Sequence, residues 1–149
     1  MVNLLRTDSG NADFRELVRL LDADLAIRDG AEHSFYAQFN RVDTIRHIVV
    51  AFENEKAVGC GAFKEYEAGA AEIKRMYVRE DKRGKGIAGK ILAELENWAK
   101  ESGFSECVLE TGLKQPEAIR LYQKSGYEII PNYGQYVGVE NSVCMKKTL

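Results

Sequence analysis

The sequence contains little of what metal, disulfide and membrane proteins depend on. Its 149 residues include only two histidines, His33 and His47, and three widely separated cysteines, with no Cys-x-x-Cys pair or Cys/His cluster. We therefore expect no metal site, and the scattered cysteines indicate buried thiols in a reducing compartment. The longest apolar runs, such as HIVVAF at 47–52, are far too short to cross a bilayer. The first residues lack the basic and apolar regions of a signal peptide, so we expect a cytoplasmic protein with no membrane partner.

The sequence also has neither a strong net charge nor a segment with the composition of a linker. The formal net charge is −2, and no Pro/Gly/Ser-rich tract or repeat interrupts the chain. This favours a single domain over residues 1–149 and argues against a nucleic-acid partner. The charge is uneven, because seven lysines and arginines lie from 74 to 90 with only Glu80 and Asp81 to offset them. We interpret this stretch either as a solvated turn or as an attractive site for a polyanion.

Hydrophobic periodicity predicts alternating strands and helices. Apolar residues at helical spacing indicate a helix to about residue 28, capped by Asn11 or Asp13. The segment 46–66 is typical of a β-hairpin with its turn at 53–56. The other expected elements are a strand at 2–6, a helical piece at 32–39, strands at 70–78 and 106–111, helices at 87–103 and 116–125, and strands at 127–130 and 142–148. The order predicts a mixed sheet with helices, in which an antiparallel first half leads into a β-α-β unit.

The stretch KRGKGIAGKI, residues 82–91, follows one expected strand and opens a helix. Its glycines at 84, 86 and 89 spell Gly-x-Gly-x-x-Gly. Without side chains the backbone can approach a ligand closely, and the free N–H groups at a helix start favour an anion such as a phosphate. The alternative is an ordinary strand-to-helix turn that uses glycine only for its dihedral angles.

The same glycine spacing also occurs in dinucleotide-binding proteins. Glu110 lies about 20 residues beyond Gly89, where such folds place an acid that binds the ribose. However, the strand before the loop contains Glu72, Lys74 and Arg75, whereas a doubly wound sheet buries its first strand on both faces. Too few residues follow for a second mononucleotide-binding half. A dinucleotide-dependent oxidoreductase is therefore kept only as an alternative.

Two stretches together resemble the GNAT superfamily of N-acetyltransferases. They are EIKRMYVREDKRGKGIAGKIL at 72–92 and EAIRLYQKSGYEII at 117–130. The family's loop, Q/R-x-x-G-x-G/A, is matched by Arg83, Gly86 and Ala88. Its later helix, L/F-Y-x-x-x-G-F/Y, is matched by Leu121, Tyr122, Gly126 and Tyr127. Either motif alone is weak, but the pair at this separation is specific, and the order of elements agrees along essentially the whole chain.

The resemblance implies a fold, a reaction and a cosubstrate. The expected fold is the α+β acyl-CoA N-acyltransferase fold, a mixed, mostly antiparallel sheet flanked by helices and splayed between the strands at 70–78 and 106–111. The expected enzyme transfers the acetyl group of acetyl-CoA to a primary amine by direct attack in a ternary complex. Residues 11–40 and 130–145 are expected to shape the acceptor site, the acceptor is left open among a small molecule, a peptide N-terminus and a protein lysine, and a homodimer is among the open oligomeric states. A non-catalytic acyl-CoA-binding or sensing module of the same fold is the main alternative.

By the same resemblance, three parts of the chain bind acetyl-CoA. Backbone amides of the loop hold the pyrophosphate, at Arg83, Gly84, Lys85, Gly86, Ile87 and Ala88, while Gly89 matters only for packing. The backbone of Met76, Tyr77 and Val78 pairs with the pantetheine arm as an extra strand. Gln115, three positions before Ala118, stands where many relatives carry an asparagine that contacts the pantetheine, and it keeps the amide on a longer side chain. The candidates for contact with the phosphates are Lys82, Lys85 and Lys124.

The resemblance also suggests two catalytic residues. Tyr122 is the expected general acid, because a phenol with an ordinary pKa of about 10 is protonated at neutral pH and can protonate the CoA thiolate. The alternative is a tyrosine that only packs on the sheet. Glu72 is the expected base that deprotonates the amine, often through water, and its alternative role is an ion pair with Lys74 or another basic neighbour. Weaker candidates at the cleft are Tyr77, Glu110 and Tyr136.

Overall fold

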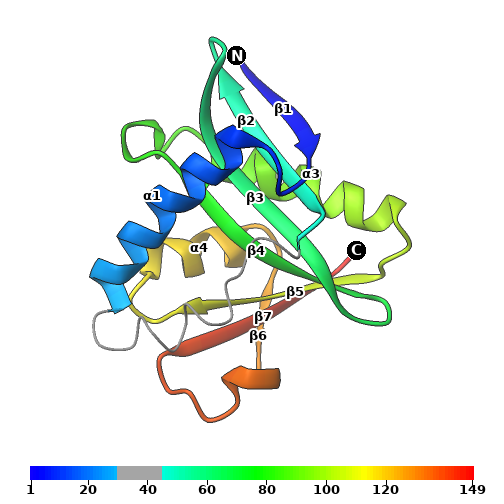
Figure 1. Cartoon of the computed structure of the whole chain (residues 1–149). Coiled ribbons are helices and arrows are strands. Elements are labelled where there is room, and N and C mark those ends of the chain that lie inside the picture. The colour runs from blue at the N-terminus through cyan, green and yellow to red at the C-terminus, as the bar shows by residue number, and fades with distance from the viewer. Residues whose placement is uncertain (30–44) are drawn as a thin grey trace.

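The computed structural model describes residues 1–29 and 45–149 (Figure 1). The strands are β1 (Val2–Thr7), β2 (His47–Glu53), β3 (Lys56–Glu67), β4 (Ala70–Val78), β5 (Glu106–Gly112), β6 (Glu128–Ile130) and β7 (Ser142–Thr148). The helices are α1 (Ala12–Asp29), α3 (Ile87–Glu101) and α4 (Pro116–Lys124), with short 3-10 turns at Glu80–Lys82 and Gly134–Tyr136. The elements predicted within these ranges are confirmed, whereas the helical piece predicted at 32–39 lies outside the described residues.

The strands form one sheet in the order β1-β2-β3-β4-β5-β7-β6. Only β4 and β5 run parallel, joined by the crossover helix α3, and the other neighbouring pairs are antiparallel. This confirms the predicted α+β fold with a mixed, mostly antiparallel sheet. It is not the doubly wound parallel sheet that a dinucleotide-binding fold requires, so that alternative is wrong for this chain.

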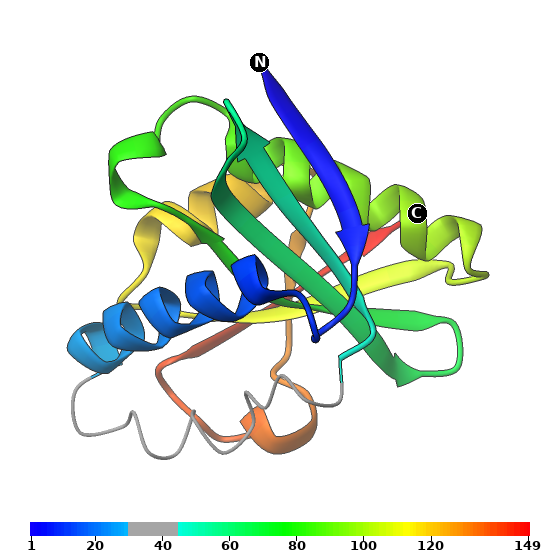
Figure 2. The ribbon, with the colours of Figure 1, turned by 45° about the horizontal axis from the view of Figure 1, so that its top comes forward.

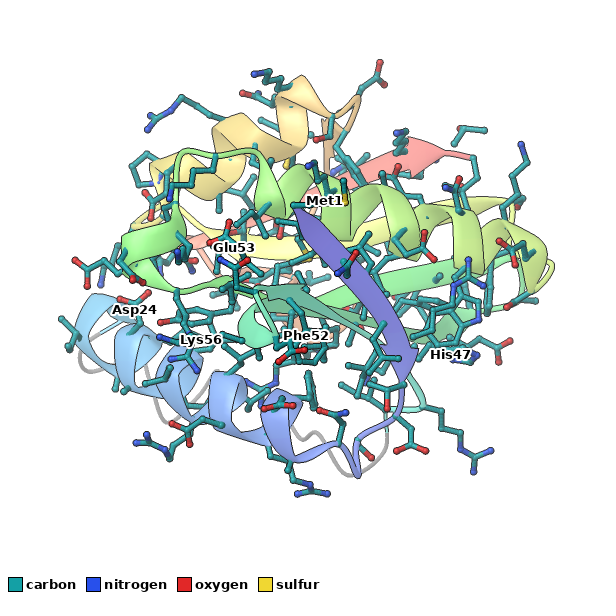
Figure 3. All side chains as sticks on the ribbon, turned by 90° about the horizontal axis from the view of Figure 1, so that it is seen from above. Met1, Asp24, His47, Phe52, Glu53 and Lys56 are labelled. Carbon is teal, nitrogen blue, oxygen red and sulfur yellow. The ribbon has the colours of Figure 1, made fainter. Side chains whose placement is uncertain are left out.

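Helices on both faces of the sheet explain the continuous apolar run of β2. Ile48 and Val50 pack in one cluster with residues of α1, whereas Val49 and Ala51 pack in another with residues of α3. Side chains alternate between the two faces along a strand, so consecutive apolar residues are expected only where both faces are covered. Figures 2 and 3 show α1 on one side of the sheet and α3 and α4 on the other.

Local signals set the ends of the helices. The Phe14 backbone N–H donates to the Asn11 side chain at 2.9 Å, so Asn11 rather than Asp13 caps α1. Helix α4 has Pro116 in its first turn, and Gly126, with a φ of 99°, follows its last turn. Over residues 1–29 and 45–149, no helix is long and apolar enough to cross a membrane.

The sheet opens between β4 and β5, as predicted. The two strands pair only from Ala70 opposite Glu106 to Ile73 opposite Leu109. Beyond that point β4 continues to Val78 paired with β3, and β5 continues to Gly112 paired with β7. Figure 1 shows the two ribbons separating. The separation places the second half of β4 at the wall of a gap, with α1 and α4 nearby.

Candidate functional site

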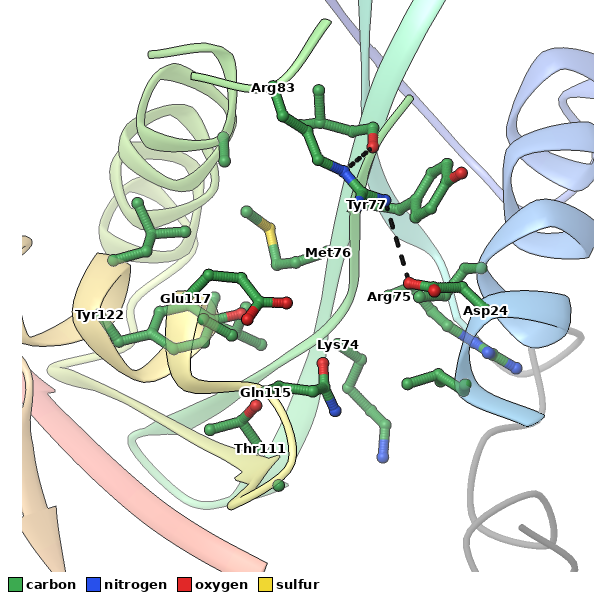
Figure 4. Close-up of a pocket in the computed structure, with 18 of the residues that line it drawn as sticks. Asp24, Lys74, Arg75, Met76, Tyr77, Arg83, Thr111, Gln115, Glu117 and Tyr122 are labelled. Atoms are coloured by element: carbon green, nitrogen blue, oxygen red, sulfur yellow. Dashed lines mark hydrogen bonds and ion pairs between the residues drawn. The ribbon is translucent and has the colours of Figure 1, made fainter. Parts of the chain in front are cut away.

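One cavity of about 400 Å³ occupies the gap where β4 and β5 separate (Figure 4). It reaches α1, α4 and the glycine loop before α3. Its lining contains all but two of the predicted site residues, namely Glu72, Met76, Tyr77, Val78, Arg83, Gly84, Gly86, Ile87, Ala88, Gln115, Ala118 and Tyr122. The two that do not line it are Lys85 and Lys124, whose side chains are exposed.

The glycine loop presents bare backbone to this cavity. Gly84 and Gly86 both have a φ of 80°, and a Cβ at either position would meet no atom within 4 Å. Helix α3 starts directly after Gly86, and no side chain caps its first N–H groups. Its apolar face is anchored by Ile87, Ile91, Leu92, Leu95 and Ala99, all buried. A rigidly held helix start with uncapped N–H groups is suited to bind an anion such as a phosphate.

Gly89, the third glycine, lacks the backbone conformation of the other two. Its φ is not in the left-handed region, although it lines the cavity and a Cβ there would likewise meet nothing within 4 Å. The expectation that Gly89 serves packing in the first helical turn is therefore wrong, because nothing packs closely enough to require a glycine. Two of the three glycines in the stretch have a conformational reason to be glycine.

Arg83 folds back from the loop into the cavity. Its Nε donates to the Val78 carbonyl at 2.9 Å, and its guanidinium lies 5.4 Å from the Tyr77 ring centre. Figure 4 shows its other end directed at Asp24 of α1, with 3.9 Å between Nη2 and Oδ2. The predicted phosphate contact Lys82 also lines the cavity, where its Nζ donates to Glu53 at 2.6 Å.

The second half of β4 forms one wall. Met76, Tyr77 and Val78 lie beyond the last pairing with β5, so β5 does not occupy their backbone on that side, which an extended ligand can use, while the Val78 carbonyl accepts the hydrogen bond from Arg83 Nε. The strand is also irregular here: Arg75 has a φ of 60°, and the register with β3 shifts between Cys60 and Ala62. This is a β-bulge, which bends the strand where it leaves β5.

Helix α4 supplies the opposite wall. Tyr122 is 7% exposed, and burial, followed by the charge of Glu110, raises the pKa of its hydroxyl above the ordinary value. Ala118 and Gln115 line the cavity from the start of the same helix. Gln115 precedes the first turn, and its amide nitrogen lies against Gly112 at the end of β5.

Glu72 is buried beside the point where the strands separate. Its carboxylate accepts a hydrogen bond from the Tyr133 hydroxyl at 2.7 Å and lies 3.8 Å from the Lys74 ammonium. The ion pair with Lys74 that was predicted as the alternative role of Glu72 is therefore present, and Glu72 also lines the cavity. Glu110 faces the same cavity from β5 and accepts a hydrogen bond from Ser142 at 2.7 Å. Two carboxylates thus line the cavity near the last β4–β5 pair.

The sequence predicts that residues 11–40 shape the acceptor part of the site, and α1 within that range does form a wall of the cavity, but the sequence does not single out which of its residues do so. Leu21, Asp24 and Leu25 line the cavity, as do Thr111 and Gly112 at the end of β5. Asp24 stands in the otherwise apolar stripe of α1, and a charged residue at such a position is the signal that would have indicated a site. No group of three or more histidine, cysteine, aspartate or glutamate side chains within the described ranges is arranged to hold a metal ion.

Comparisons with known proteins agree with this geometry. The family model of the acetyltransferase (GNAT) family matches residues 14–127. A protein of Azospirillum brasilense named IAA acetyltransferase is 37% identical over 102 residues, which cover 68% of this chain and 67% of that protein.

Two solved structures are similar to the chain over its whole length. A crystal structure from Klebsiella pneumoniae, named provisionally as an acyl-CoA N-acyltransferase, has a TM-score of 0.84 at 28% identity and covers 100% of this chain and 98% of its own. The PaiA N-acetyltransferase of Thermoplasma acidophilum, solved in complex with coenzyme A, has a TM-score of 0.73 at 18% identity, with 100% and 99% covered.

Proposed function

Because the chain belongs to the acetyltransferase (GNAT) family, whose cosubstrate is acetyl-CoA, we propose that it transfers the acetyl group to a primary amine by direct attack in a ternary complex. The observation that supports this most is the continuity of one cavity from the uncapped start of α3 to Tyr122 and Glu72. The cavity offers an anion site, an open strand edge, a phenol and a carboxylate in one continuous space.

In this proposal the pyrophosphate of acetyl-CoA binds the backbone amides from Arg83 to Ala88. The pantetheine arm pairs with the backbone of Met76, Tyr77 and Val78, where β4 has no neighbouring strand on the β5 side. Gln115 and Ala118 border the same arm from α4. Arg83 must rotate or slide aside, because its side chain now crosses the cavity from Val78 toward Asp24. The exposed side chains of Lys85 and Lys124 lie outside the cavity lining and are the candidates for contact with the phosphates of acetyl-CoA.

The chemistry divides between Glu72 and Tyr122. The neutral amine nitrogen bonds to the thioester carbon, the carbon–sulfur bond breaks, and the amine proton passes to Glu72 directly or through water. The sulfur leaves as a thiolate beside the Tyr122 hydroxyl. The raised pKa of Tyr122 keeps that hydroxyl protonated at neutral pH. The same raised pKa makes complete transfer of the Tyr122 proton to a thiolate unfavourable in free energy. Tyr122 therefore acts first as a hydrogen-bond donor to the charge that develops on the sulfur.

The variant Tyr122→Phe tests this role. We expect kcat to fall by roughly 10²-fold or more, the usual contribution of such a group, while the Kd for acetyl-CoA measured by calorimetry changes little. Tyr127→Phe is the matched control. Its ring lies 5.8 Å from that of Tyr122, but its hydroxyl donates to Glu96 at 2.9 Å and it does not line the cavity. A kcat of Tyr122→Phe within twofold of the unmodified enzyme would show that the phenol has no part in the reaction.

A further inference from the structure

Two cations in the cavity have no role in the reaction described above. Lys74 and Arg75 follow the last β4 residue that pairs with β5, and each is only 8% exposed. Both line the cavity. Removing a charged group from water is costly unless the charge is compensated or used, so two adjacent buried cations in a substrate cavity call for a function.

A bulge in β4 lies at the point where both side chains leave the strand. In a regular strand, neighbouring residues point to opposite faces of the sheet. Here two residues, Arg75 and Met76, stand opposite one residue of β3, and Arg75 adopts a φ of 60°. For a residue with a Cβ that conformation is unfavourable, and such strain is common at functional sites. In Figure 4, Lys74 extends beside Gln115 and Arg75 extends from β4 toward α1, and both side chains leave the same stretch of strand.

Carboxylates neighbour both cations, but one nitrogen of Arg75 is left without a hydrogen-bond partner among the described residues. An Nη1 hydrogen of Arg75 donates to Asp22 at 2.7 Å, but Arg75 Nε has no hydrogen-bond partner among the described residues. The Lys74 ammonium is 3.8 Å from Glu72, longer than a direct hydrogen bond. Burial lowers the pKa of Lys74, Glu72 and Glu110 oppose that shift, and Lys64 and Arg75 add to it. An additional anion beside this pair would therefore stabilise the charged form of Lys74.

We propose that the acceptor is a small amine that also carries a carboxylate, an amino-acid-type zwitterion, with its carboxylate beside Lys74 and Arg75 and its amine toward Glu72 and Glu110. This inference rests on the proposed acetyl transfer to an amine. Glu72 lies 3.8 Å from Lys74, and the charges of Glu110 and Arg75 also act on Lys74, so one compact molecule can meet both the carboxylates and the cations. A diamine would place its second ammonium against the cations, and a plain alkylamine would gain nothing from them.

The experiment compares acceptors that differ in one group. Each set consists of an amino acid, its amide and the matching decarboxylated amine, taken from α-, β- and γ-amino acids. Turnover is followed by release of CoA thiol. We expect kcat/KM for the best amino acid to exceed that of its amide and its decarboxylated amine by at least tenfold. If the amide and the decarboxylated amine, which lack the carboxylate, turn over as fast as the amino acid or faster, the proposal is overturned. If no amine is acetylated at all, that result refutes instead the proposed acetyl transfer to small amines.

Variants separate a binding role from a purely structural one. Lys74→Gln and Arg75→Gln are expected to lower kcat/KM for the amino acid by at least tenfold and to change kcat/KM for its amide by less than threefold. A purely structural role would lower kcat/KM equally for the amino acid and for its amide, and that result would contradict the assignment. Lys64→Gln is the matched control, because Lys64 is a nearby cation on β3 that does not line the cavity. If Arg75→Gln fails to fold after losing the Asp22 contact, Lys74→Gln and the comparison of acceptors decide the question.

Discussion

Replacing single glycines of the 82–91 stretch tests whether CoA binding depends on backbone conformation at individual glycines or on the Gly-x-Gly-x-x-Gly pattern as a whole. Gly86 has a φ of 80°, and a Cβ there would project into open space at the edge of the cavity. Alanine in that conformation costs about 1–2 kcal/mol. For a chain of this size, about 1 kcal/mol shifts the unfolding midpoint by roughly 2–4 °C. We therefore expect Gly86→Ala to lower the midpoint by about 2–8 °C and to weaken CoA binding at least tenfold.

Gly89→Ala is the matched substitution three residues later. Gly89 lies inside α3 without a positive φ, and its Cβ would meet no neighbour. Alanine in a helix interior is favoured over glycine by about 0.5–1 kcal/mol, so the unfolding midpoint should rise slightly. Thermal unfolding by circular dichroism and calorimetric titration with CoA measure both effects. If Gly89→Ala weakens CoA binding as much as Gly86→Ala does, the argument from backbone conformation is wrong and all three glycines act together.

Two further predictions concern the carboxylates and the thiols. Glu72→Gln should lower kcat/KM by about 10²-fold and Glu110→Gln by much less; the reverse order in steady-state assays would assign the base to Glu110. Burial raises the pKa of Cys60 to about 12 and that of Cys107 and Cys144 to about 11, so the thiolate fraction at pH 8 is very small. We expect the native protein not to react with Ellman's reagent at pH 8, and three thiols to react after unfolding in guanidinium. Rapid reaction of one thiol in the native protein would contradict the burial of these residues.

Much of the fold could be predicted because its signals are local. The apolar run of β2, the turn before β3 and the amphipathic face of α3 each depend on residues close together in the chain. Asn54 and Glu55 adopt positive φ values in the tight turn between β2 and β3, within the segment predicted as the hairpin turn. The parallel pairing of β4 with β5 followed from the helix between them, since such a crossover joins parallel strands.

The sequence by itself determined the backbone geometry of the glycine loop, because a strand, two glycines and a helix start are consecutive and need no distant partner. Only the tertiary structure decided the end of the cavity where we propose that the acceptor binds. Tyr133 reaches Glu72 from 61 positions away, and Asp22 reaches Arg75 from 53 positions away. The bulge at Arg75, beside the cavity that Lys74 and Arg75 line, arises from the register of β4 on β3. Contacts of this kind depend on how whole elements pack, and no spacing within one segment of the chain encodes them.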